Sequence, residues 1–372
     1  MSASTTGRLG WTVITPLLGA VVLAFVWGTH PGPVMAGVIG VVLVAAVLAA
    51  VHQAEVVAHR VGEPFGSLLL AVAVTIIEVG LILMLMSSGG KDTSGLARDT
   101  VFAAVMITLN GIVGLSLVVG AVRHRLAIFN AEGTGSALAT VLALAGLTLV
   151  VPTFTISEPG PIFTGHQLAF AAVVSLALYG CFVFTQTVQH RDFFLPVARG
   201  AAAQGTNPAD LDGDDHADPP TGRETLVSLA MLLVSLIAVV GLAKVESYPI
   251  EDAVDALGMP HAVVGVVIAL LVLAPETIAA VRAALRDRVQ ISLNLAYGSA
   301  MASIGLTIPA IAIASIWIDG DLALGLGSLQ LALLVLSGIV SVLTVVPGRA
   351  KPLNGAVHLV LLAAFLFLTI AP

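Results

Sequence analysis

The chain is poor in charged and aromatic residues and has almost no cysteine. Only 10% of its 372 residues are charged and 5% are aromatic, whereas an ordinary soluble domain has about 25% charged residues. The single cysteine, Cys181, lies within an apolar run, so a disulfide framework is excluded and we expect a buried, unreactive thiol. A net charge of -7 also argues against nucleic acid as a partner.

The chain is instead rich in long apolar runs. Hydrophobic residues make up 58% of the chain, and runs of at least about 18 of them are long enough to cross a bilayer as helices. The first run begins near Trp11 and no small-residue cleavage pattern follows it, so we expect a retained span rather than a cleaved signal sequence. The sequence therefore predicts an all-α polytopic membrane protein, with membrane lipid as its surroundings.

Hydropathy and the Gly and Pro punctuation between apolar runs predict eleven transmembrane helices. We place them at residues 11–28, 34–56, 64–87, 99–121, 134–151, 166–187, 224–244, 259–281, 290–316, 322–346 and 353–371.

The basic residues predict the orientation of these helices. With a cytoplasmic N-terminus, twelve of the fifteen Lys and Arg residues fall in cytoplasmic segments. These twelve are Arg8, Arg60, Arg123, Arg125, Arg191, Arg199, Arg223, Arg282, Arg286, Arg288, Arg349 and Lys351. Basic residues concentrate on the cytoplasmic side of membrane proteins. We therefore expect a multi-pass protein of a bacterial inner membrane whose C-terminus is external or periplasmic.

The spans divide the chain into four segments. Residues 1–33 form an extra N-terminal helix, residues 34–189 a first five-helix repeat, residues 190–223 a cytoplasmic acidic linker and residues 224–372 a second five-helix repeat. The linker carries Asp210, Asp212, Asp214, Asp215 and Asp218 among Gly, Pro and Asn. A solvated connection is one interpretation of this composition, and a patch that collects cations is the other.

Two repeats with an odd number of spans are inverted in the membrane, an architecture typical of transporters with a binding site near the midplane. An ordered set of residues supports the repeat. In each half a Gly-x-Pro precedes a glutamate deep in one span, and an asparagine with a glycine four residues later follows in the next span. The set is Pro64, Glu78, Asn110 and Gly114 in the first half and Pro260, Glu276, Asn294 and Gly298 in the second.

The two glutamates are the strongest functional signal. Glu78 and Glu276 are, by hydropathy, the only acidic residues within the apolar cores. An ionised carboxylate at the centre of a membrane helix costs on the order of 3 kcal/mol, so such residues usually face a polar interior. One buried glutamate could simply be protonated and bonded to a neighbouring carbonyl, but two at matching positions favour a shared cation site.

Oxygen ligands for this site are available nearby. Calcium takes several carboxylate, amide and hydroxyl oxygens, and Asn110 and Asn294 lie on the helices that follow the glutamates. No resident cofactor is expected, because the ions are cargo: calcium and protons, with sodium or potassium as further candidates.

Further candidates for the metal site are Thr75, Leu271, Ser299 and Ser303. Thr75 lies one turn before Glu78, although a membrane-helix threonine often bonds its own backbone. Pro275 removes a helical hydrogen bond and leaves the Leu271 carbonyl available. Ser299 and Ser303 could line a path or could permit close helix contact.

Proton coupling follows from the glutamate pair. Two like charges close together at low dielectric cannot both stay ionised without a cation, so metal and proton compete for the carboxylates. No HExxH motif or nucleophile-base arrangement points to an enzyme. Six histidines lie at span ends or in loops and are expected to be solvated: His52, His59, His124, His190, His216 and His261.

Three stretches of the chain resemble the calcium/proton antiporters of the cation/calcium exchanger superfamily, and most closely the bacterial calcium (sodium, potassium)/proton antiporter branch. They are Gly62–Val79, Phe129–Gly135 and Ala274–Pro309. The resemblance implies one extra helix plus five plus five. It also implies that Glu78 and Glu276 match the ion-binding glutamates, with Asn110 and Asn294 near the polar positions of the following helices.

The chain departs from the plant and fungal members of this superfamily. Those have Gly-Asn ahead of each repeat glutamate and a histidine after the second, whereas Thr75-Ile-Ile precedes Glu78 here and Thr277 follows Glu276. The sequence therefore predicts a cation/proton antiporter with calcium as the first cargo. A sodium-coupled calcium exchanger is the alternative, and a cation channel or a membrane enzyme ranks lower.

Overall fold

The computed structural model describes residues 10–62, 65–86, 94–197, 220–317 and 322–372. The chain forms two compact units, and each draws on both halves of the sequence. The first comprises Met1–Gly89 and Pro219–Ala256, and the second comprises Gly90–Asp218 and Leu257–Pro372.

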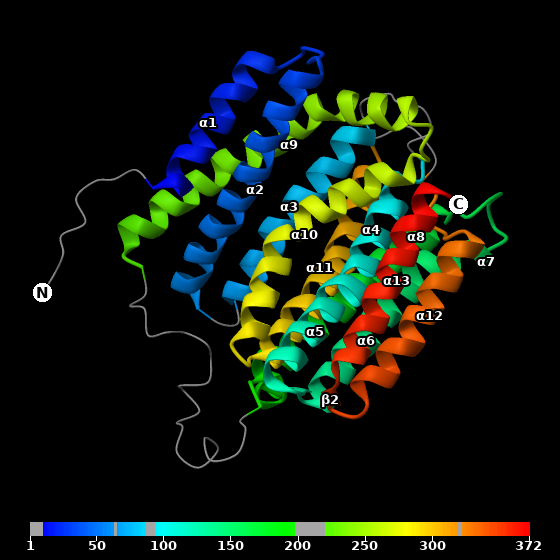
Figure 1. The fold of residues 1–372 in the computed structure, drawn as a ribbon. Coiled ribbons are helices and arrows are strands. Elements are labelled where there is room, and N and C mark those ends of the chain that lie inside the picture. Colours follow the sequence, from blue (N-terminus) through cyan, green and yellow to red (C-terminus); the bar gives the residue numbers. More distant parts are fainter. Residues whose placement is uncertain (1–9, 63–64, 87–93, 198–219, 318–321) are drawn as a thin grey trace, which may run out of the picture. The chain divides into compact units, whose positions relative to one another are not determined.

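Four helices make up the described part of the first unit (Figure 1): α1 (Trp11–Val26), α2 (Pro33–Val61), α3 (Phe65–Met86) and α9 (Gly222–Ala256). The long helix α9 packs against the other three. Small residues allow this, because a methyl group at Gly80 of α3 would lie 2.6 Å from Val240 of α9. The backbones of α3 and α9 therefore approach closely at this point.

The second unit contains the remaining elements. In chain order they are α4 (Leu96–Met106), η1 (Ile107–Ile112), α5 (Val113–His124), β1 (Ala127–Ile128), α6 (Ala131–Ala145), η2 (Gly146–Val150), α7 (Val151–Phe154), α8 (Gly165–Phe184), η3 (Thr185–Gln189), η4 (Arg191–Phe194), α10 (Ala262–Leu285), α11 (Val289–Ala314), α12 (Ser328–Val345), β2 (Arg349–Ala350) and α13 (Pro352–Ile370). Helix α11 packs against α6, α8 and α10, and so supplies much of the core. Strands β1 and β2 pair antiparallel.

Two glycines allow a close crossing in the second unit, between α5 and α13. A methyl group at Gly355 would lie 2.6 Å from the carbonyl oxygen of Gly114 and 2.7 Å from the amide nitrogen of Val118. Both neighbours are backbone atoms that a side-chain rearrangement cannot move aside. Only a residue without a Cβ fits at this position.

The prediction of an all-α polytopic membrane protein is confirmed. Nine helices in the described part of the chain are long and apolar enough to span a bilayer, and α1 and residues Ala71–Met84 of α3 are shorter apolar helices. The count of eleven spans and the inverted repeats stay predictions. Most predicted bounds agree within a few residues, counting α4–η1–α5, α6–η2–α7 and α8–η3 as one span each.

Two predicted bounds are wrong by more. Helix α9 continues to Ala256, twelve residues past the predicted end. Its last turns contain polar residues, which a hydropathy criterion excludes from a span. Helix α12 begins at Ser328 instead of 322. The residues before it make backbone bonds instead, with an isolated bridge between Ala323 and Ile162 and a bond from Leu326 N to Leu149 O at 2.9 Å.

The expectation of a buried thiol is also wrong. Cys181 is exposed on α8, because an apolar residue of a membrane helix can face lipid as readily as the protein core. The five linker aspartates and His216 lie outside the described residues.

Candidate functional site

Glu78 and Thr75 lie together on α3 of the first unit. They are three residues apart and therefore share one face of the helix. Their side chains are 4% and 7% exposed. The flanking residues are almost all apolar, so hydrophobic burial forms this helix and carries the carboxyl group inward.

Glu276 lies on α10 of the second unit, directly after Pro275. Proline has no backbone N–H, so the carbonyl of Leu271 cannot accept the usual bond from four residues later. The side chains of Glu276 and Leu271 are half-buried. Glu78 and Glu276 belong to different units, and their sharing of one pocket stays a prediction.

Asn110 lies on η1, a π-helical segment within an otherwise α-helical span. Such segments are frequent at functional sites. The Asn110 amide nitrogen donates to Ser337 Oγ of α12 at 2.9 Å, and its Oδ1 lies 3.3 Å from His358 Nδ1 of α13. His358 Nε2 in turn lies 3.2 Å from Thr344 Oγ1. These four buried side chains join η1 to α12 and α13.

His358 is a residue that sequence reasoning missed. Its side chain is 0% exposed. One neutral tautomer satisfies the cluster, with Nδ1–H donating to Asn110 and Nε2 accepting from the Thr344 hydroxyl. The available signal was an ionisable side chain inside the predicted span 353–371.

The cluster uses one lone pair of the Asn110 carbonyl oxygen and leaves the second. That second lone pair is the ligand atom that Asn110 would offer to a cation, and this role stays a prediction.

Asn294 lies in a different polar cluster, near the start of α11. Its amide nitrogen donates to Phe194 O at 2.6 Å, and its Oδ1 accepts from Gln290 Nε2 at 2.8 Å. Gln290 Oε1 accepts from the backbone N–H of Asn130 at 2.6 Å. The cluster thus fixes the start of α6 and the segment η4 onto α11, and the two repeat asparagines have different surroundings.

The glycines of the repeat also differ. Gly114 forms the close crossing with α13, whereas a methyl group at Gly298 would meet no atom of the described residues within 4 Å. Ser299 is half-buried and Ser303 is 4% exposed on the same helix. Their role beside an ion stays a prediction.

Two further acidic residues are buried, although they lie outside the apolar cores in which the sequence places only Glu78 and Glu276. Asp99 of α4 is buried and accepts from Arg98 Nε at 2.8 Å and Gln330 Nε2 at 3.1 Å. Glu246 of α9 is also buried. Both lie near span ends. There a hydropathy pattern predicts exposure to water, although neighbouring helices bury the side chain.

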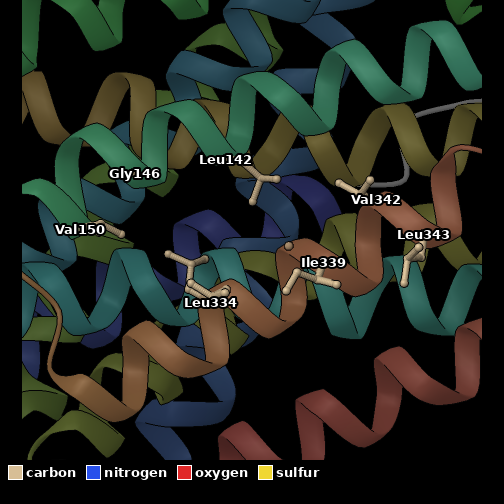
Figure 2. Close-up of a pocket in the computed structure, with 9 residues that line it drawn as sticks. Leu142, Gly146, Val150, Leu334, Ile339, Val342 and Leu343 are labelled. Carbon is tan, nitrogen blue, oxygen red and sulfur yellow. The ribbon is translucent and has the colours of Figure 1, made fainter.

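Within the described residues, no group of three or more His, Cys, Asp or Glu side chains could hold a metal ion. A groove of about 460 Å³ lies between α6–η2 and α12 (Figure 2). Its lining consists of Leu142, Gly146, Val150, Leu334, Val335, Gly338, Ile339, Val342 and Leu343. These side chains present only carbon, so the groove suits a lipid tail and offers no ligand to a cation.

Comparison with known proteins places these features in a family. A family model described as sodium/calcium exchanger protein matches residues 32–188 and 227–371. The chain is 46% identical over 370 residues to y4hA of Sinorhizobium fredii, which is described only as an ionic transporter, covering 97% of this chain and 96% of the relative. It is 34% identical over 360 residues to the sodium-potassium/proton antiporter ChaA of Escherichia coli, covering 95% of this chain and 94% of the relative.

A solved structure has the same fold. The structure of native YfkE superimposes with a TM-score of 0.71 at 16% sequence identity, covering 97% of this chain and 99% of that chain. At this identity the likeness concerns the fold alone.

Proposed function

Because this chain belongs to the sodium/calcium exchanger protein family, we propose that it is a secondary antiporter that exchanges a metal cation for protons. The observation that carries the proposal is the pair of glutamates, Glu78 and Glu276, each preceded by Gly-x-Pro and followed by Asn-x-x-x-Gly. Glu78 is buried in its unit at 4% exposure. The protein is a multi-pass membrane protein, and we place it in a bacterial cell membrane with a cytoplasmic N-terminus because of its basic residues.

Glu78 and Glu276 would share one cation site. A divalent ion neutralises two carboxylates, and two protons do the same. Either loaded state carries no net charge and can change its access from one side to the other. The empty site carries two negative charges, and removing them from water would be costly. The empty site therefore does not change its access from one side to the other, and exchange is obligatory.

Oxygens around the pair would complete the coordination. The Thr75 hydroxyl lies on the same face of α3 as Glu78. The Leu271 carbonyl, five residues before Glu276, lacks its usual helical partner because of Pro275. Asn110, Asn294, Ser299 and Ser303 remain candidates for the ion path. Their present partners would have to share or release them.

Calcium is the first cargo on charge balance, since two carboxylates match one divalent ion. The 34% identical relative is named as a sodium-potassium/proton antiporter, which supports potassium and sodium as further cargo. One monovalent ion would neutralise only one carboxylate, and the other would then keep a proton. A sodium-coupled calcium exchanger is the second candidate, because the matching family is named for that reaction.

Proteoliposomes with an acidic lumen and a fluorescent pH probe test the proposal. We expect the lumen to become alkaline after addition of calcium, and after addition of potassium or sodium if these are carried. With the voltage clamped at zero by valinomycin and equal potassium, calcium alone should still move protons. Calcium uptake that requires a sodium gradient and leaves lumenal pH unchanged would establish the sodium-coupled alternative and overturn the proposal.

A further inference from the structure

Glu246 is a buried carboxyl group of the first unit that the exchange mechanism above does not use. Its side chain is 6% exposed, and its Oε1 has no hydrogen-bond partner among the described residues. It continues a buried stripe of α9 formed by Ser235, Val239 and Leu242. These positions precede it by eleven, seven and four residues and therefore share its face.

The register of α1 against α9 shows what surrounds this face. A methyl group at Gly19 of α1 would lie 3.2 Å from Ala238 Cβ, and the Lys244 ammonium lies 5.6 Å from the centre of the Trp27 ring. The two helices therefore run in the same direction. The Val26 end of α1 lies at the level of Glu246.

Helix α2 runs in the opposite direction to α1. At the far end of the pair, Gln53 Nε2 donates to the carbonyl oxygen of Thr12 at 2.7 Å. The Pro33 end of α2 therefore lies beside the Val26 end of α1. Since α9 packs against both helices, these two ends lie at the level of the stretch of α9 that carries Glu246.

No cationic side chain of the described first unit faces Glu246. Helix α1 carries no titratable residue, and the only one of α3 is Glu78. Those of α2 all lie toward its Val61 end: His52, Glu55, His59 and Arg60. On α9 itself Lys244 points to Trp27, about 200° around the helix from Glu246, and the ring of Tyr248 pairs with that of His30.

This environment decides the protonation of Glu246. An ionised carboxylate costs several kcal/mol when one of its oxygens is buried without a partner and the described part of its unit offers no facing cation. A neutral carboxylic acid avoids most of that cost. The burial of Oε1 therefore favours the neutral, protonated form of Glu246 in this conformation, and exchange of that proton requires water at the carboxyl group.

The position of Glu246 connects it with the glutamate of the same unit. Helices α3 and α9 run in the same direction (Figure 1) and touch at Gly80 and Val240. Glu78 precedes this contact by two residues and Glu246 follows it by six, so at 1.5 Å per residue they are separated by about 12 Å along the bundle. Glu246 thus lies between Glu78 and the Ala256 end of α9.

We propose that Glu246 is a proton-binding site of the first unit, which takes up and releases transported protons on the side of the membrane where α9 ends. This rests on the proposed proton antiport. When the first unit opens at that end, the carboxylic acid gives its proton to water and becomes a carboxylate. A proton taken from hydronium restores the acid before the unit closes.

The test combines transport with a direct measurement of proton binding. In reconstituted protein, Glu246→Gln should slow proton-coupled cation flux on the order of 100-fold and leave the cation concentration for half-maximal flux unchanged. In infrared difference spectra between low and high pH, the variant should lose one carboxylic-acid C=O band. Glu246→Asp keeps a carboxyl group, so it should keep a band and recover part of the rate.

Asp252→Asn is the matched control, because Asp252 is exposed on the same helix. It should leave flux and spectrum unchanged. An unaltered infrared band or a wild-type flux in Glu246→Gln would overturn the assignment. The spectrum does not depend on transport, so a wild-type protein that moves no protons would refute the antiport reaction while the band still reports on Glu246.

Discussion

We expect Glu78→Gln or Glu276→Gln to abolish cation-driven proton movement, while the protein still inserts in the membrane. The amide keeps the size of the side chain but cannot carry the charge that a divalent ion needs or bind the proton that replaces it. Breaking a buried ionic arrangement costs about 3 kcal/mol or more, so cation affinity should fall on the order of 100-fold or more. Lumenal pH in proteoliposomes and calcium binding by calorimetry measure the two effects.

Glu158→Gln is the control for this pair of variants. Glu158 is exposed in the connection between α7 and α8, and its replacement should leave both measurements unchanged. A Glu78→Gln or Glu276→Gln protein that couples calcium to protons at the wild-type rate would remove the carboxylate pair from the mechanism.

The second large effect concerns folding. Gly355→Val should prevent α13 from packing on α5, because the new Cβ would lie 2.6 Å from the Gly114 carbonyl oxygen and 2.7 Å from the Val118 nitrogen. Overpacking against side chains costs about 1 to 3 kcal/mol, and here the backbone itself must move, so we expect about 3 kcal/mol or more. The variant should aggregate, or have a melting temperature far below that of the wild type. Heating in detergent, with the remaining folded protein measured by size-exclusion chromatography, checks this.

Gly180→Val provides the matched control. A methyl group at Gly180 of α8 meets no atom of the described residues within 4 Å, so both variants share the same change in helix propensity and only one creates a clash. Equal melting temperatures for the two variants would show that the crossing tolerates a side chain.

The sequence predicted the helices well because membrane spans depend on a single property, the length of an apolar run. The predicted span ended too early at the Ala256 end of α9, where the helix continues through polar residues. The burial of Glu246 was therefore not predicted. Hydropathy judges each residue by its own stretch of chain. Burial at a span end depends instead on neighbouring helices, such as α1 and α2, that pack over it.

The candidate site was predicted only in part. Glu78 is buried as expected, and α10 carries Glu276 directly after Pro275. The asparagines were expected to behave alike because their spacing is the same, yet Asn110 bonds Ser337 and Asn294 bonds the Phe194 carbonyl. Equal spacing along two chains does not fix which helices pack against them, and no local pattern would have paired Asn110 with His358, 248 residues later.

The most direct test of the shared cation site is a cross-link between its two proposed carboxylate positions. Cys181 is the single cysteine of the chain, so Cys181→Ser gives a thiol-free background for Glu78→Cys and Glu276→Cys. A protease site inserted between Asn207 and Pro208 then separates the two cysteines. If both side chains reach one ion, a single Hg²⁺ should bridge the thiolates, and the cleaved protein should remain one band on a denaturing gel.

Glu158→Cys with Glu276→Cys should give two fragments under the same treatment, because Glu158 is exposed in a connection. Two fragments from the Glu78→Cys and Glu276→Cys protein, with both thiols shown to react with a small maleimide, would contradict the shared site.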